Sequence, residues 1–137
     1  MDCVGMMRSR DLAPYIGLAY DPEHFDCVDL VRLVSRELMG REVDLPGGHP
    51  RGRKRLPMVQ SVARQIAVPT DAPEDGDLVL MFDRGLPVPT HVGLYFNLAH
   101  EGWVLHVGAG IPFSTTHALR DLAGLGAPIE RIYKWAN

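Results

Sequence analysis

One cysteine and two histidines have the residue types and the spacing that nucleophilic catalysis needs. Cys27 follows Asp26 at the expected start of a helix, and His91 and His106 lie far downstream on expected strands. A thiolate attacks a carbonyl carbon when a histidine takes the thiol proton and a third residue orients that histidine. The three side chains are therefore the raw material of a Cys-His-His triad, provided that the fold brings them together.

The helix that carries Cys27 is expected over about residues 27–39. Asp26 is a good N-cap, and Asp29 stands where the return partner of a capping box would be. Apolar residues recur at helical spacing, and Gly40 is a natural stop. The unpaired N–H groups of a helix N-terminus lower the pKa of a cysteine placed there. A lone cysteine on a helix is otherwise most often packed in the core, so Cys27 alone does not establish a nucleophile.

His91 and His106 are expected on two neighbouring strands joined by a hairpin at residues 97–102. Adjacent strands lie about 4.8 Å apart, so two such side chains on one face can hydrogen-bond. A helix N-terminus packed across that face would bring Cys27 to His91. The alternative is a pair of half-buried histidines bonded to backbone carbonyls. The remaining histidines are weaker candidates, in expected loops, at a helix edge or before the helix: His24, His49, His100 and His117.

The order of the remaining elements predicts an α+β domain. A short helix or turn is expected within residues 11–20, and a second helix within 57–69. Residues 114–125 are expected to form a short helix or an ordered loop. Helices followed by a mostly antiparallel sheet predict one domain over residues 1–137, with its core at about 11–135. The expected strands are residues 77–82, 87–96, 103–107 and 129–135.

Composition excludes several classes of function. The chain has 137 residues, 46% of them apolar, which is enough for a single core. Its net charge of −3 lacks the positive field typical of nucleic-acid binding. No apolar run approaches the roughly 20 residues of a membrane span, and the N-terminus lacks the pattern of a signal peptide. We therefore expect no nucleic-acid or membrane partner, and a protein that stays in the cytosol unless it leaves with an assembly or by a non-classical route.

The cysteines and the motif spacings point away from structural sulfur or metal chemistry. Cys3 and Cys27 do not make a disulfide framework. No CxxC or HExxH spacing occurs that would support a zinc site. We therefore expect neither a metal nor a cofactor.

Three blocks of residues follow one another along the chain: Tyr20 with Phe25-Asp26-Cys27-x-x-Leu30-Val31, then Asp75-Gly76-Asp77-Leu78-Val79-Leu80, and then His91-Val92-Gly93-Leu94-Tyr95 with His106 beyond. In this order they resemble the NlpC/p60 family of cell-wall cysteine peptidases, most closely its small phage tail-assembly branch. The resemblance implies a papain-like α+β fold with N-terminal helices packed on the sheet. It implies Cys27 as nucleophile and His91 as base. His106 would then orient His91, and Tyr20 would lie beside the oxyanion.

The resemblance also implies a substrate, and several settings stay open. The family hydrolyses amide bonds in peptidoglycan stem peptides, commonly the bond from γ-D-glutamate to diaminopimelate. The protein could act as a phage or prophage tail component with other tail proteins as partners, or as a secreted amidase toxin. A catalytically inactive structural or wall-binding tail module and an acyltransferase or amidase for another substrate are the alternatives. The basic loop 41–55 could pair with stem-peptide carboxylates or remain solvated.

Overall fold

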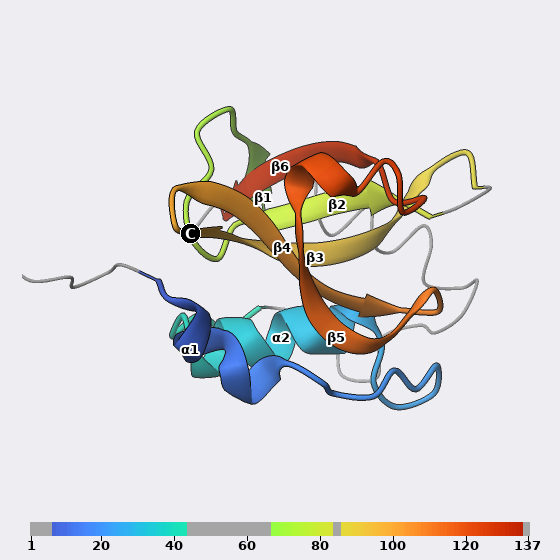
Figure 1. The fold of residues 1–137 in the computed structure, drawn as a ribbon, viewed down its shortest axis with the longest axis horizontal. Coiled ribbons are helices and arrows are strands. Elements are labelled where there is room, and N and C mark those ends of the chain that lie inside the picture. Colours follow the sequence, from blue (N-terminus) through green and yellow to red (C-terminus); the bar gives the residue numbers. More distant parts are fainter. Residues whose placement is uncertain (1–6, 44–66, 84–85, 136–137) are drawn as a thin grey trace, which may run out of the picture.

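The computed structural model describes residues 7–43, 67–83 and 86–135. These residues form an α+β structure in which one long helix packs on a six-stranded antiparallel sheet (Figure 1). The helices are α1 (Ser9–Leu12), the 3₁₀ turn η1 (Ala13–Tyr15), α2 (Cys27–Glu37) and the 3₁₀ turn η3 (Leu119–Asp121). The strands are β1 (Ala67–Pro69), β2 (Leu78–Phe82), β3 (Pro89–Leu98), β4 (Glu101–Gly108), β5 (Ile111–Ala118) and β6 (Ile129–Trp135).

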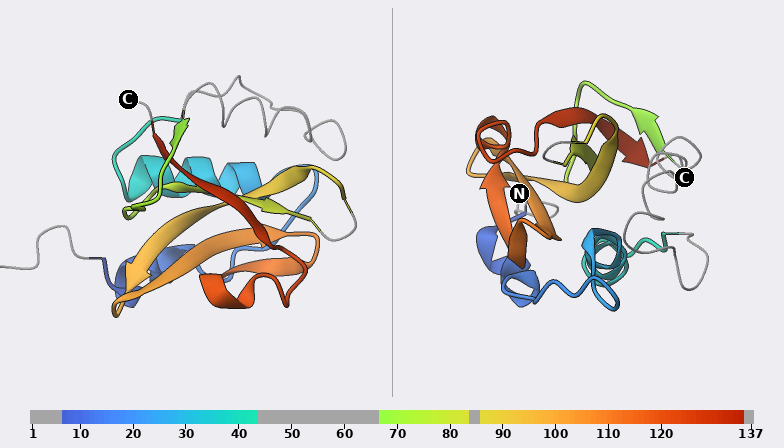
Figure 2. Two further views of the ribbon diagram at one scale, coloured as in Figure 1. Left: turned by 90° about the horizontal axis from the view of Figure 1, so that it is seen from above. Right: turned by 90° about the vertical axis from the view of Figure 1, so that its right-hand side faces the viewer.

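The sheet has the strand order β1-β6-β2-β3-β4-β5, with every neighbouring pair antiparallel. β3 and β4 are the longest pair, and they are joined by a tight turn in which Ala99 and His100 both have positive φ, 53° and 66°. Two consecutive residues of this kind are typical of a type I′ hairpin turn. The sheet is strongly twisted, and α2 lies along one side of it (Figure 2).

Helix α2 begins where the sequence predicts, at Cys27, and ends two residues before the expected position 39. The Asp26 side chain accepts hydrogen bonds from the backbone N–H groups of Val28 (3.0 Å) and Asp29 (3.2 Å). The Asp29 carboxylate accepts one in return from the Asp26 N–H at 2.8 Å, which completes the capping box. The last helical residue is Glu37, and Gly40 has a φ of +66° that allows the chain to leave the helix. The start of the helix, which carries Cys27, is therefore firmly held.

Asp29→Ala should remove half of this capping box without touching the sulfur of Cys27. Asp29 lines a surface depression with Arg32 and Arg36, whereas Cys27 is fully buried. We expect the free energy of unfolding to fall by about 1 kcal/mol in urea titrations, the usual effect of losing a helix cap. Asp29→Asn keeps an accepting oxygen and should lose less. A change in the Cys27 alkylation rate as large as tenfold at neutral pH would contradict this purely structural role.

The segment before α2 is fixed along the outer edge of β5. Leu18 N–H donates to Ser114 Oγ at 2.9 Å, and that hydroxyl donates to the Tyr15 carbonyl at 2.6 Å. Tyr20 N–H donates to the Pro112 carbonyl at 2.8 Å. These bonds place Tyr20 beside the β4–β5 turn, although it is distant from that turn in sequence.

Two expectations about secondary structure are wrong. Residues 67–69, expected to end a helix, form strand β1 and pair with residues 133–135 of β6. Residues 114–118, the first part of a segment expected to hold a short helix or an ordered loop, belong to β5, which pairs with β4. The short helix of that segment is present only as η3, at Leu119–Asp121. Threonine favours strands, and Pro69 at the end of an edge strand leaves no ladder bond unmade. Residues 57–66 and the basic run of loop 41–55 lie outside the described residues.

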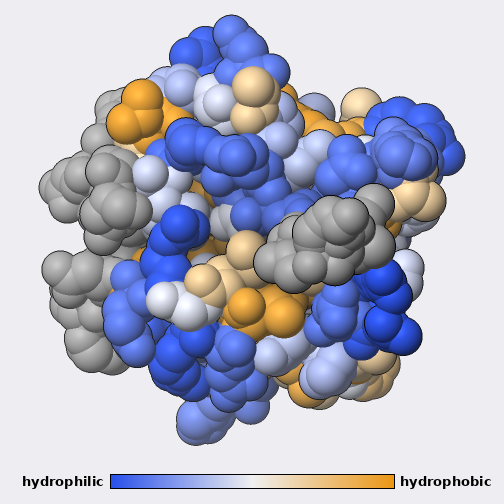
Figure 3. Space-filling model, turned by 90° about the vertical axis from the view of Figure 1, so that its left-hand side faces the viewer, coloured by the Kyte–Doolittle hydropathy of each residue, from blue (hydrophilic) through white to orange (hydrophobic). Residues whose placement is uncertain are grey.

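The buried apolar residues form two clusters, one on each face of the sheet. α2 packs on β3 and β4 and contributes Leu30, Val31 and Val34 to the larger cluster. The smaller cluster, on the other face, contains Tyr95 and Val104. Hydrophilic residues cover most of the molecular face seen in Figure 3, with small hydrophobic areas between them. The other members of the smaller cluster are Val79, Met81, Leu122 and Ala127.

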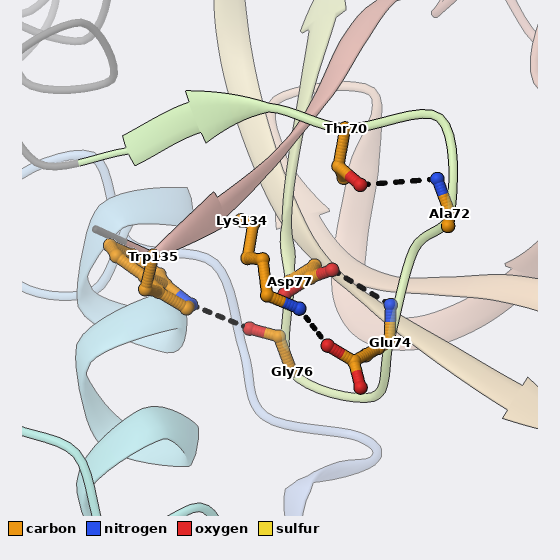
Figure 4. A network of polar contacts seen from close by, with 7 residues as sticks. All are labelled: Thr70, Ala72, Glu74, Gly76, Asp77, Lys134 and Trp135. Carbon is orange, nitrogen blue, oxygen red and sulfur yellow. Dashed lines mark hydrogen bonds and ion pairs between the residues drawn. The ribbon is translucent and has the colours of Figure 1, made fainter. Parts of the chain in front are cut away.

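A polar network around Asp77 closes the loop between β1 and β2 (Figure 4). The Asp77 carboxylate accepts a hydrogen bond from the Glu74 N–H at 2.7 Å, and Trp135 Nε1–H donates to the Gly76 carbonyl at 2.7 Å. Lys134 pairs with Glu74. Asp77 is only 4% exposed, and this burial raises its pKa to about 6; Arg41 acts in the opposite sense and Asp75 in the same one.

Asp77→Asn should stabilise the protein at neutral pH. Folding raises the pKa of Asp77 from 3.8 to about 6, so the folded state holds the proton more tightly than the unfolded state. Ionised Asp77 therefore lowers stability progressively as the pH rises from about 4 to about 6, and the full penalty persists above that window. Asparagine keeps an acceptor for the Glu74 N–H, so we expect a gain of roughly 1–2 kcal/mol at pH 7 that disappears below pH 4.

Thermal unfolding of wild type and Asp77→Asn across pH 4–8 measures this effect. Asp71→Asn is the matched control, since Asp71 is exposed in the same loop, and it should leave the pH profile unchanged. An Asp77→Asn variant that is less stable than wild type at pH 7, or a difference that grows toward pH 4, would contradict the burial argument.

Candidate active site

The expected triad residues come from elements that meet at one end of the molecule. The N-terminus of α2, the start of β3 and the β4–β5 turn lie together, at the right in Figure 1 and in the first view of Figure 2. Cys27 is the first residue of α2, and His91 is the third residue of β3. His106 lies near the end of β4. The topology therefore gathers at one end three residues that are up to 79 positions apart in sequence (106 − 27).

Cys27 occupies the N-terminal position that favours a thiolate, but it is 0% exposed. Its side chain belongs to the apolar cluster between α2 and the sheet. The helix N-terminus stabilises negative sulfur, whereas removal from water destabilises it. The two influences oppose each other, so the ionisation of Cys27 depends on its polar surroundings.

His91 and His106 form the hydrogen bond that the sequence predicts. His91 Nε2 lies 2.8 Å from His106 Nδ1, and the ring centroids are 5.0 Å apart. His91 is 3% exposed and His106 is fully buried. Their rings lie on the sheet face that carries Tyr95 and Val104, opposite the face covered by α2. The sequence suggested that the helix packs directly across the histidine face, but α2 packs on the opposite face of the sheet.

Two glycines make room for the histidine pair. A Cβ atom on Gly93 would lie 3.0 Å from the Cβ of His106, and one on Gly108 would lie 3.1 Å from Cε1 of His91. The first also would come within 2.8 Å of the Leu105 carbonyl oxygen, which belongs to the backbone and cannot yield as a side chain can. Gly93 and Gly108 therefore act as the close-approach positions that let the two rings cross diagonally between β3 and β4.

The structure adds a third histidine to this pair. His117 on β5 was expected at a helix edge, but its Nδ1 lies 2.9 Å from His106 Nε2, with the two rings nearly perpendicular at 85°. The three rings form one row across β3, β4 and β5, here called the histidine row. The ring nitrogens bond to one another in sequence, from His91 to His106 and from His106 to His117. They therefore do not point at one shared position, as metal ligands would, and the row is a hydrogen-bond chain. A strand assignment for residues 111–118 would have revealed the role of His117, because the antiparallel pairing of that strand with β4 places His117 near His106.

His106 stays neutral in the middle of the histidine row. Burial, with the neighbouring rings of His91 and His117 acting in the same sense, lowers its pKa to about 2. A neutral imidazole has one N–H and one accepting nitrogen, so His106 donates one of its two bonds and accepts the other. His106 can thus orient His91 without itself taking up a proton at neutral pH.

A cavity of about 480 Å³ opens beside His91 and Tyr20. Its third polar lining residue is Asp83, whose carboxylate accepts a hydrogen bond from the Thr90 hydroxyl at 2.7 Å. The cavity therefore combines a mainly small and apolar wall with the predicted base and the predicted oxyanion residue. Cys27 is not among the described residues that line it. The other lining residues are Leu86, Gly108, Ala109, Gly110, Ile111, Leu125, Gly126 and Ala127.

Of the weaker histidine candidates other than His117, the two that are described, His24 and His100, lie away from the histidine row. His24 is exposed and contacts the Asp21 carboxylate at 3.1 Å, and His100 lies in the β3–β4 turn. His49 falls outside the described residues. Within residues 7–43, 67–83 and 86–135, no three metal-ligating side chains are grouped to hold an ion, and no helix is long and apolar enough to cross a bilayer.

A search of protein-family models found no match to the sequence, and a search of curated proteins also found none.

Proposed function

We propose that the protein is a cysteine hydrolase that cleaves amide bonds in peptidoglycan stem peptides, of the γ-D-glutamyl-diaminopimelate type, as a component of a phage or prophage tail. The observation that carries this proposal is the 2.8 Å hydrogen bond between His91 and a neutral His106, at the edge of a cavity that Tyr20 also lines. The start of α2, which carries Cys27, lies at the same end of the molecule. The order of the three sequence blocks supports the same assignment.

The chemistry assigned to these groups is an acyl transfer in two halves. The Cys27 sulfur attacks the carbonyl carbon of the amide, and its proton passes to Nδ1 of His91, because Nε2 is engaged with His106. The oxyanion of the tetrahedral intermediate lies near Tyr20 and the N-terminus of α2. Protonated His91 then donates its proton to the leaving amine, which gives a thioester. Water, deprotonated by His91, attacks the thioester and releases the carboxylate and the thiol.

Defined muropeptides test the reaction and the bond together. Purified protein with reduced Cys27 should split a disaccharide tripeptide into two fragments whose summed mass exceeds the substrate by one water. Mass spectrometry should place the new amine on diaminopimelate and show the glycan intact. Shortened glycan strands, or no cleavage of any wall preparation, would overturn the hydrolase assignment.

One structural observation favours a second candidate, an inactive structural or wall-binding tail module. Cys27 is 0% exposed and is absent from the described cavity lining. A module of this kind would bind peptidoglycan sacculi in a pull-down yet release no stem-peptide fragments. It would also leave Cys27 unmodified by a small alkylating probe at neutral pH, whereas the hydrolase should be modified and inhibited together.

A further inference from the structure

The histidine row runs without a break from the cavity to the edge of the sheet. His91 lines the cavity, and its Nε2 lies 2.8 Å from His106 Nδ1. His106 Nε2 lies 2.9 Å from Nδ1 of His117, which is half-exposed on β5, the last strand of the sheet. The proposed triad uses only the inner two rings. The outer ring, that of His117, is hydrogen-bonded to His106 but is not a member of the triad.

The two hydrogen bonds of the row must run in the same direction. Neutral His106 carries a single ring proton, on either Nδ1 or Nε2. If the proton is on Nε2, His106 donates outward to His117 and accepts from His91. If the proton is on Nδ1, His106 accepts from His117 and donates inward to His91. The direction of one bond thus fixes the direction of the other.

Only the outward direction leaves His91 able to act as the base. In that direction His91 holds its proton on Nε2, and its Nδ1 has the lone pair that takes a proton from a thiol. In the inward direction Nε2 of His91 accepts, so a neutral His91 must already hold its proton on Nδ1. The inward direction also points an N–H at a ring that becomes an imidazolium during the reaction, and two opposed N–H groups repel.

We propose that His117 is a positioning residue that holds the row in the outward direction, by accepting the His106 Nε2–H at its own Nδ1. The inference rests on the proposed function, because His91 needs a basic Nδ1 only if it deprotonates Cys27. His117 is not among the residues that line the cavity. It acts through His106, as the carboxylates and carbonyls behind metal-bound histidines fix the tautomer of those ligands.

The ring-nitrogen shifts of the wild-type protein test the direction without any variant or substrate. In ¹⁵N-histidine-labelled protein at neutral pH, two-bond ring correlations distinguish a protonated from an unprotonated nitrogen. We expect His91 and His106 both to be protonated on Nε2 and His117 to be unprotonated on Nδ1. A proton on Nδ1 of His106 would overturn the proposal.

Two substitutions at His117 test its effect on turnover. His117→Asn can place its amide oxygen near the position of Nδ1 and accept the same hydrogen bond. His117→Leu offers no acceptor. We expect His117→Leu to lower kcat by about tenfold or more with KM unchanged, and His117→Asn to stay within about threefold of wild type. The ring shifts of His106 should become mixed or reversed in His117→Leu alone.

Thr116→Val is the matched control on β5, because Thr116 is half-buried like His117 but its side chain points to the other face. It should leave both kcat and the ring shifts unchanged. Wild-type kcat and unchanged His106 shifts in His117→Leu would reduce His117 to a packing residue and overturn the proposal. Absence of turnover in the wild type would instead refute the proposed function, while the ring shifts would still decide the direction of the row.

Discussion

Cys27→Ser should lower the rate of stem-peptide cleavage by about a thousandfold or more, the scale seen when a nucleophile is removed from a triad. A serine hydroxyl at this position ionises far less readily than a thiol, and the helix N-terminus cannot make up the difference. The substitution is small, but it buries a hydroxyl where the chain has a fully buried thiol. We therefore also expect a modest loss of stability, of about 1–2 kcal/mol.

Cys3→Ser is the matched control, and it should keep full activity; Cys3 lies outside the described residues. Alkylation by iodoacetamide near pH 7, resolved by site with mass spectrometry, should modify Cys27 faster than Cys3 and inactivate the enzyme in parallel. Equal rates at the two cysteines would remove the case for an activated thiolate. Residual activity above a tenth of wild type in Cys27→Ser would exclude Cys27 as the nucleophile.

The parts of this site that the sequence predicts are those encoded by local pattern. The capping box depends on Asp26 and Asp29, three residues apart, and its hydrogen bonds appear as expected. The α+β arrangement and the four predicted strands are confirmed, with shifts of one or two residues at their ends. The pairing of His91 with His106 follows from two strands joined by a short hairpin, which is also a local arrangement.

The parts that the sequence did not predict depend on long-range contacts. β1 forms because residues 67–69 find a partner in β6, more than sixty positions downstream (133 − 69 = 64). Strand β5 shows no clear alternation of buried and exposed residues, since Pro112 and Phe113 are both exposed. The strand that bears His117 therefore lacks the alternating pattern by which strands are predicted from sequence. The Ala99-His100 turn has none of the glycine or asparagine that usually marks a type I′ hairpin. The sequence also did not predict which face of the sheet α2 covers, because that depends on how all the strands pack together and not on any one segment.

His91→Ala should abolish turnover, whereas the outcome at His106 should depend on what replaces it. His91 is the one histidine of the row that lines the cavity, and its loss removes the base from both halves of the reaction. His106→Asn can keep one polar contact to His91 and should retain measurable activity. His106→Ala leaves an unfilled space at a fully buried position and removes the hydrogen-bond partner of His91 Nε2, so it should lose more activity.

Steady-state kinetics on the muropeptide substrate, with the Tm of each variant as a check on folding, measures this order. His100→Asn is the control, since His100 has a φ of +66° in the β3–β4 turn that asparagine tolerates, and it should be fully active. The expected order of activity losses follows from which histidine acts on which. His91 acts on the substrate, His106 acts on His91, and His106 remains neutral because its pKa lies near 2. A His91→Ala variant with near wild-type kcat would rule out this triad, and a His106→Asn variant as inactive as His91→Ala would show that His106 does more than orient its neighbour.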